Sequence, residues 1–146
     1  MRKPLMKVLA FGVARSQEAE TFFKEWAPQV DDPAIQALFA QLAAAERGRT
    51  EMLSRMMPEE MVRATGDAGD VLDLPDLLVD IKVPRRSTLG QAIRTVVQRK
   101  GATAVLYERI AQLGGVACSF FRAMAEEDRQ TICQLEEYAK QIPSRE

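Results

Sequence analysis

The sequence has no histidine among its 146 residues and only two cysteines. Imidazole is the commonest metal ligand in proteins, so its absence excludes every histidine-ligated metal site. The cysteines, Cys118 and Cys133, flank one predicted helix and lie far apart along it, which argues against an internal disulfide. They also form no C-x-x-C motif of the redox or zinc type. We therefore expect free thiols in a reducing cytoplasm.

Long apolar runs and a large net charge are also missing. No run is long enough for a membrane-spanning helix, and a net charge of −1 gives no support for nucleic-acid binding. Met1-Arg2-Lys3 and the apolar residues after them have the outline of a signal peptide. However, Lys7 interrupts the apolar run, and the helical periodicity continues past Ala14. We expect a cytoplasmic protein without a membrane or nucleic-acid partner.

The chain repeats itself. Residues 16–27 align with 100–111, and residues 38–53 align with 120–135, with one short gap in the connecting turn. Hydrophobic residues make up 47% and charged residues 28% of the sequence, which is ordinary for a globular domain. The length fits one domain. A duplicated helical hairpin therefore predicts a four-helix bundle.

Apolar residues recur in alternating steps of three and four along four segments, the pattern of packed helices. The four predicted stripes are Leu9, Gly12, Ser16, Ala19, Phe23 and Trp26; Phe39, Leu42, Glu46, Arg49, Leu53 and Met56; Ile93, Val96, Lys100, Thr103, Tyr107 and Ile110; and Phe121, Met124, Asp128, Thr131, Leu135 and Tyr138. Asp32 and Pro33 are typical of the start of the second segment, and Ser87 or Thr88 is a cap candidate for the third. The long connection over 58–87 predicts a crossover that lets the second and third helices lie parallel. The expected helices span about 5–27, 33–57, 88–113 and 116–141 of a single domain, 1–146.

Each of the four stripes is apolar at its ends and polar in its middle. Burying a polar group without a partner costs a few kcal/mol. Four helices with polar residues at one level therefore predict a shared polar layer. Its members are Ser16, Glu46, Arg49, Lys100, Asp128 and Thr131.

The segment DDPAIQALFAQLAAAERGRTEML over 31–53 resembles the second helix of the rubrerythrin-like branch of the ferritin-like superfamily. There, an Asp-Pro cap and Leu-Phe-x-x-Leu-Ala lead into Glu-x-x-His. Residues 6–27 are similar to that family's first helix, and LPDLLVDI at 74–81 is similar to part of its crossover. The third and fourth segments repeat the pattern, so the resemblance covers nearly the whole chain. It implies an all-α, ferritin-like antiparallel four-helix bundle.

Members of this family bind two iron or manganese ions through one Glu on each of helices one and three, and a Glu-x-x-His on each of helices two and four. The resemblance places these ligands at the six residues of the predicted layer, flanked by Phe23 and Tyr107. Only Glu46 matches the family, and Asp128 is a shortened carboxylate. The others depart from the pattern, and neither Arg49 nor a protonated Lys100 can ligate a metal.

We interpret the layer as an ion-pair cluster in place of the metal centre, with Glu46 and Asp128 facing Arg49 and Lys100. It would then be neutral without metal. A second interpretation has both cations reaching outward to solvent and leaving two hydrogen-bonded acids. A third keeps a single or displaced metal. Glu18 and Glu20 could serve such a site, although they fall off the inner stripe.

The missing ligands favour a non-catalytic bundle that acts as a binding or oligomeric scaffold without a cofactor. The resemblance implies a homodimer, because bundles of this family commonly dimerise. The alternative is a rubrerythrin-like metal-dependent oxidoreductase or iron-binding protein with an altered site. In that case Glu46 and Asp128 would hold iron or manganese. A bundle that binds a small apolar ligand is a further alternative that no residue specifically favours.

Overall fold

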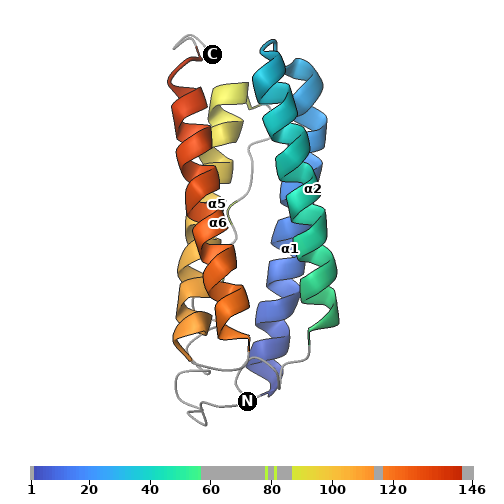
Figure 1. The fold of residues 1–146 in the computed structure, drawn as a ribbon, viewed down its shortest axis with the longest axis vertical. Coiled ribbons are helices and arrows are strands. Elements are labelled where there is room, and N and C mark those ends of the chain that lie inside the picture. The colour runs from blue at the N-terminus through green and yellow to red at the C-terminus, as the bar shows by residue number, and fades with distance from the viewer. Residues whose placement is uncertain (1, 57–77, 79–80, 82–86, 114–116, 143–146) are drawn as a thin grey trace. The chain divides into compact units, whose positions relative to one another are not determined.

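The computed structural model describes residues 2–56, 78, 81, 87–113 and 117–142. This part of the chain is helical, contains four long helices and has no strand. The elements are α1 (Arg2–Trp26), the 3-10 turn η1 (Ala27–Gln29), α2 (Pro33–Arg55), α5 (Leu89–Gln112) and α6 (Cys118–Ala139) (Figure 1). The predicted all-α class with four helices is confirmed, and each helix ends within a few residues of its predicted bounds.

The starts of α2 and α5 are fixed by the residues that the sequence indicated. The Asp32 carboxylate Oδ1 accepts a hydrogen bond from the Ala34 backbone N–H at 2.9 Å, and Pro33 is the first helical residue. Thr88 forms a capping box, in which its hydroxyl accepts from the Gln91 N–H and the Gln91 side chain accepts from the Thr88 N–H. Both devices satisfy backbone donors that have no partner within the helix.

Most of the predicted 58–87 crossover and the Gly114-Gly115 break lie outside the described residues. Ile81 is one of the described residues of this connection. The Arg99 side chain of α5 donates a hydrogen bond from Nε to the Ile81 carbonyl oxygen. The Ile81 carbonyl therefore lies within reach of a side chain from the middle of α5.

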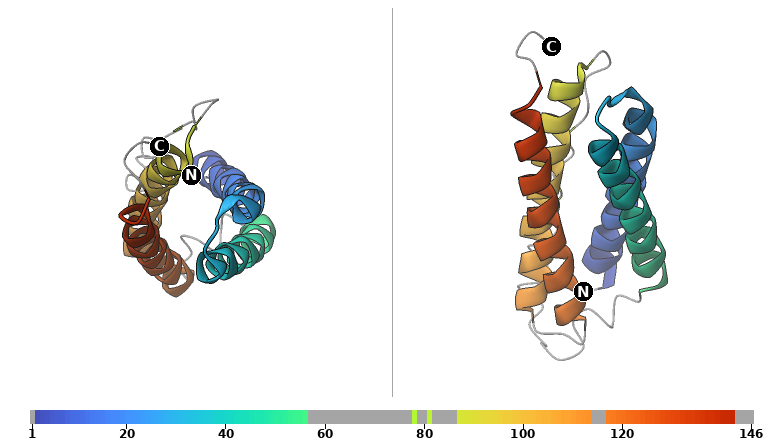
Figure 2. Two further views of the ribbon diagram at one scale, coloured as in Figure 1. Left: turned by 90° about the horizontal axis from the view of Figure 1, so that it is seen from above. Right: turned by 45° about the horizontal axis from the view of Figure 1, so that its top comes forward.

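The chain divides into two compact units. The α1–α2 unit is Ala10–Arg55, and the α5–α6 unit is Met1–Leu9 with Met56–Glu146. Within each unit, the helix pair runs side by side in both views of Figure 2. Aromatic contacts join α1 and α2. The centroid of the Phe39 ring lies 5.4 Å from that of Phe23 and 6.2 Å from that of Phe22. In the α5–α6 pair, the Tyr107 and Phe121 rings lie 5.7 Å apart.

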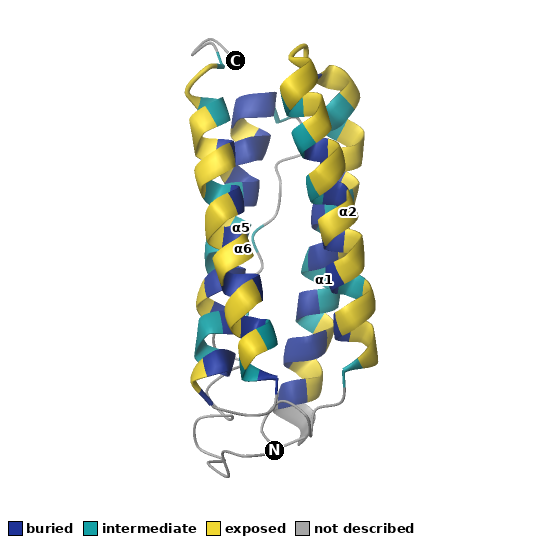
Figure 3. Cartoon of the chain, viewed as in Figure 1, coloured by how far each residue is buried: buried dark blue, intermediate teal, exposed yellow. Residues whose placement is uncertain are grey.

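The predicted stripes form the core. Their positions are buried on all four helices and recur turn after turn between exposed residues (Figure 3). On α5 every predicted stripe residue is buried, from Ile93 to Ile110. Four stripe residues are only half-buried. Leu42 lies within α2, and the other three lie at or near helix ends: Trp26, Met56 and Tyr138. Among the described residues, no helix combines the length and apolar character that crossing a membrane requires.

Candidate functional site

All six polar residues predicted at the middle of the helices are buried. Their exposed fractions are 2% for Ser16, 5% for Glu46, 8% for Arg49, 5% for Lys100, 0% for Asp128 and 7% for Thr131. The interpretation in which Arg49 and Lys100 reach out to solvent does not hold, because neither residue is exposed. Buried charges need partners, so the contacts of these side chains decide what the positions do.

In the α5–α6 unit, Lys100 and Asp128 form an ion pair across the two helices. The Lys100 Nζ lies 3.2 Å from the Asp128 Oδ1. The Thr103 hydroxyl donates a 2.7 Å hydrogen bond to Asp128 Oδ2. Each carboxylate oxygen of Asp128 therefore has a polar contact of its own, and the ammonium and the hydroxyl approach it from the same helix.

Helix geometry explains why these three side chains meet. Lys100 and Thr103 are three residues apart on α5 and therefore share a face. Asp128 is on the facing stripe of α6 and is fully buried. The Thr103 hydroxyl also lies 3.1 Å from the Lys100 carbonyl oxygen. A hydroxyl has one proton, so the shorter bond to the charged carboxylate is the stronger of the two.

Thr103 was not among the predicted polar residues, although it lies on the predicted stripe. Its position three residues after Lys100 was the available signal. Threonine is a weak signal within a helix because its hydroxyl can be satisfied by its own helix backbone. Thr50 and Thr95 do this, with hydrogen bonds to carbonyls one turn earlier at 3.0 and 3.1 Å.

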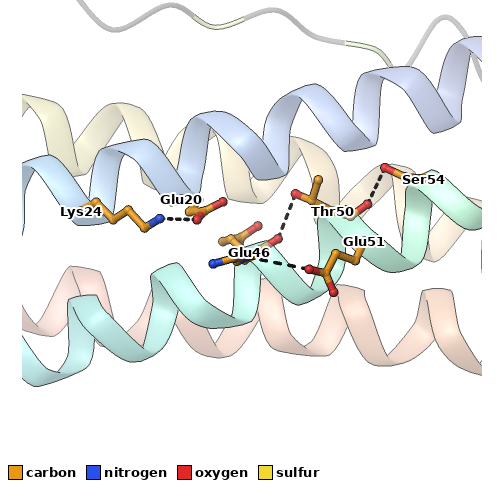
Figure 4. Close-up of polar contacts among 7 residues, drawn as sticks. Glu20, Lys24, Glu46, Thr50, Glu51 and Ser54 are labelled. Carbon is orange, nitrogen blue, oxygen red and sulfur yellow. Dashed lines mark hydrogen bonds and ion pairs between the residues drawn. The ribbon is translucent and has the colours of Figure 1, made fainter.

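In the α1–α2 unit, Ser16 belongs to α1, while Glu46 and Arg49 are three residues apart on α2. Figure 4 shows Glu46 and Glu20 on the two neighbouring helices. The Glu20 carboxylate pairs with Lys24 of its own helix at 2.6 Å. Glu18 likewise pairs with Arg15 at 2.6 Å. Both acids considered for a displaced metal site therefore have a cationic partner one turn away on α1.

The donor set does not fit a centre of two metal ions. Each unit contains one buried carboxylate and one buried cation among the six positions: Glu46 with Arg49, and Asp128 with Lys100. A centre of two dications needs several anionic ligands to balance its charge. Within the described ranges, no group of three or more His, Cys, Asp or Glu side chains is placed to hold a metal ion.

The surroundings of the polar positions are aromatic. Phe23 and Tyr107, the predicted flanking residues, are 0% and 1% exposed. Each lies two turns beyond a polar position on its own helix, Ser16 or Lys100, and each packs against an aromatic ring of the neighbouring helix. Both rings therefore belong to the buried core two turns along the same stripes.

A second ion pair joins α5 and α6 at the surface. The Arg129 Nε donates a hydrogen bond to Glu108 Oε1 at 2.7 Å, and the two side chains are 52% and 42% exposed. This hydrogen bond lowers the pKa of Glu108 below its ordinary value and raises the pKa of Arg129. The two cysteines are free thiols as expected, with Cys118 half-buried and Cys133 exposed.

No protein-family model, curated protein or solved structure matches this chain.

Proposed function

We propose that the chain is a non-catalytic, ferritin-like four-helix bundle in which buried ion pairs replace a di-metal centre. In this proposal it acts in the cytoplasm as a binding or oligomeric scaffold, most simply as a homodimer. The observation that carries the proposal is the Lys100–Asp128 pair, in which an ammonium lies 3.2 Å from a fully buried carboxylate oxygen.

Charge balance supports this proposal over a metalloenzyme. In each unit one buried carboxylate is matched by one fixed cation, Glu46 by Arg49 and Asp128 by Lys100, so each set is neutral before any metal binds. A divalent ion added there would leave two uncompensated positive charges in a water-poor interior, which is strongly unfavourable. The hydroxyls of Ser16 and Thr131 add no negative charge.

Elemental analysis tests the proposal. The untagged protein is purified after growth in medium rich in iron and manganese, and the metal content per chain is measured. We expect well under one equivalent. About two equivalents per chain would overturn the proposal and favour the rubrerythrin-like oxidoreductase or iron-binding alternative.

A rebuilt variant provides the matched control. Ser16→Glu, Arg49→His, Lys100→Glu and Thr131→His together give the six positions family-like ligands, with Asp128 the one imperfect member. Without metal this variant should be less stable, because acids crowded in one low-dielectric layer repel each other. Ferrous or manganous ion should raise its melting temperature but not that of the parent, since a ligand of the folded state stabilises by mass action. A folded variant without this response would show that the six positions are aligned wrongly.

The scaffold part of the proposal is tested by molar mass in solution. Light scattering coupled to size-exclusion chromatography should give about twice the chain mass of 16.3 kDa. A monomer at all concentrations would refute the homodimer. A monomeric state would not bear on metal binding, which the elemental analysis tests separately.

A further inference from the structure

The Asp128 carboxylate contacts two groups of α5, the Thr103 hydroxyl and the Lys100 ammonium. Its Oδ2 accepts a hydrogen bond from the Thr103 hydroxyl with an oxygen–oxygen distance of 2.7 Å, which fixes the orientation of the carboxylate. Its Oδ1 faces the Lys100 Nζ at 3.2 Å. Asp128 is 0% exposed and Thr103 is 4% exposed, so both side chains are held away from bulk water. Hydrogen bonds to ionised groups are stronger than those between neutral groups, particularly where water is excluded.

The single negative charge of the Asp128 carboxylate favours a monovalent cation over a divalent one. One carboxylate carries one negative charge, which one ammonium neutralises. A divalent ion at the same place would leave a net positive charge among buried apolar side chains. The buried neighbours on the same stripes, Val96 and Thr103 on α5 and Met124 and Thr131 on α6, carry no negative charge that could balance a divalent ion.

We propose that the α5–α6 unit contains a binding site for a primary ammonium ion, which Lys100 fills with its own side chain. Shortening Lys100 then opens this site to a free alkylammonium ion. The inference deepens the proposed function by naming the cation class of the buried position. It depends only on contacts within the α5–α6 unit and not on the bundle arrangement.

The size of the free ligand follows from the side chain that it replaces. Lys100→Ala removes Cγ, Cδ, Cε and Nζ, which together have the heavy-atom skeleton of n-propylammonium. The apolar stem of the ligand would lie where the Lys100 methylenes lie, among buried residues. Its ammonium would lie at Asp128 Oδ1. A free ligand of this shape therefore restores both the packing and the charge.

The experiment is rescue of Lys100→Ala by n-propylammonium chloride, followed by thermal unfolding in far-UV circular dichroism. We expect Lys100→Ala to melt well below the wild type. The amine should raise its melting temperature by roughly 3–6 °C at about ten times the dissociation constant, because stabilisation grows with the logarithm of ligand concentration. Propan-1-ol, which has the stem without the charge, should do much less. Manganous chloride at equal ionic strength should do nothing.

Three control chains isolate the site. Lys100→Met keeps the stem volume and should not respond to the amine, because the space is filled. Lys100→Ala combined with Asp128→Asn also removes the negative charge of the carboxylate, and its melting temperature should not respond to the amine either. Lys140→Ala removes an exposed lysine whose side chain is 76% exposed, and should behave as the wild type.

Equal rescue by propylammonium and propan-1-ol would overturn the proposal, since the site would then recognise only apolar volume. Rescue of the variant that lacks the Asp128 charge would also overturn it. A Lys100→Ala chain that regains no helical signal at any amine concentration overturns it as well. These outcomes are independent of the elemental analysis, which tests metal binding by the unaltered chain.

Discussion

Replacing the buried ion pair by apolar residues of similar size tests its energetic role most directly. Lys100→Met leaves the Asp128 carboxylate buried without its ammonium, and Asp128→Leu leaves the ammonium without its carboxylate. Lys100→Met combined with Asp128→Leu removes both charges. We expect the double variant to be more stable than either single variant.

The magnitudes follow from the burial and the distance. Two unit charges 3.2 Å apart attract by about 5 kcal/mol at an effective dielectric constant of about 20. Removing one partner of a buried pair typically costs about 3–5 kcal/mol, and neither Lys100 nor Asp128 is exposed enough for solvent to screen the remaining charge. Replacing both partners by apolar groups often leaves stability unchanged. The free energy of unfolding of the double variant should therefore lie within about 1 kcal/mol of the wild-type value. The Thr103 hydroxyl keeps an acceptor in that variant, the Lys100 backbone carbonyl at 3.1 Å.

The assay is urea unfolding of the wild type, both single variants and the double variant. The coupling energy is taken from the four free energies of unfolding. The matched control is the same cycle on Glu108 and Arg129, which join the same two helices at the surface. There we expect a coupling of about 0.2–1 kcal/mol, because solvent screens exposed pairs. If the double variant loses as much stability as the sum of the two single variants, Lys100 and Asp128 act independently and the reasoning fails.

Three further predictions concern the helices. Gly48→Ala on α2 should stabilise the protein by about 0.5–1 kcal/mol in urea unfolding, because an added Cβ meets no atom within 4 Å and alanine favours the helix; a loss of stability would contradict this. Asp32→Ala should cost about 1 kcal/mol through the lost cap of α2, whereas Asp31→Ala should change stability by less than about 0.5 kcal/mol. The pKa of Glu108 is lowered from 4.5 by the hydrogen bond from Arg129, so the pair contributes above pH 4.5, and its contribution is lost as the pH falls through the lower folded-state pKa. The small advantage of the wild type over Glu108→Gln should therefore shrink in acid and in high salt, and an advantage that grows in acid would refute this.

The sequence predicted the helices well because their signals are local. Both caps depend on residues within one turn. The structure has Asp32 at the start of α2 as expected, and of the two candidates Ser87 and Thr88 it has Thr88 as the cap of α5. The stripes were predictable for a similar reason, since a period near 3.6 residues defines one face of a helix. The central polar positions could be identified because a charged residue on an otherwise apolar stripe stands out.

The partners of the polar residues were not predictable to the same degree. Helical periodicity gives the face of a side chain but not the atom opposite it on another helix. The predicted cluster of four charges contained the Lys100–Asp128 pair, which the structure shows at 3.2 Å, while the part of Glu46 and Arg49 in that cluster stays a prediction. Thr103 was missed as a partner of Asp128 because threonine on an apolar stripe has an alternative acceptor in its own helix.

The buried pair also determines how the α5–α6 hairpin aligns. Two apolar stripes that repeat every seven residues tolerate a slip of two turns, because apolar side chains meet apolar side chains again. Asp128 removes this tolerance. After such a slip, the neighbour of its carboxylate would come from the position of Ile93 or Tyr107 in place of Lys100, and the buried carboxylate would lose the ammonium that lies 3.2 Å away. A single polar contact among apolar ones can thus distinguish the native alignment from its nearest competitors even where its net contribution to stability is small.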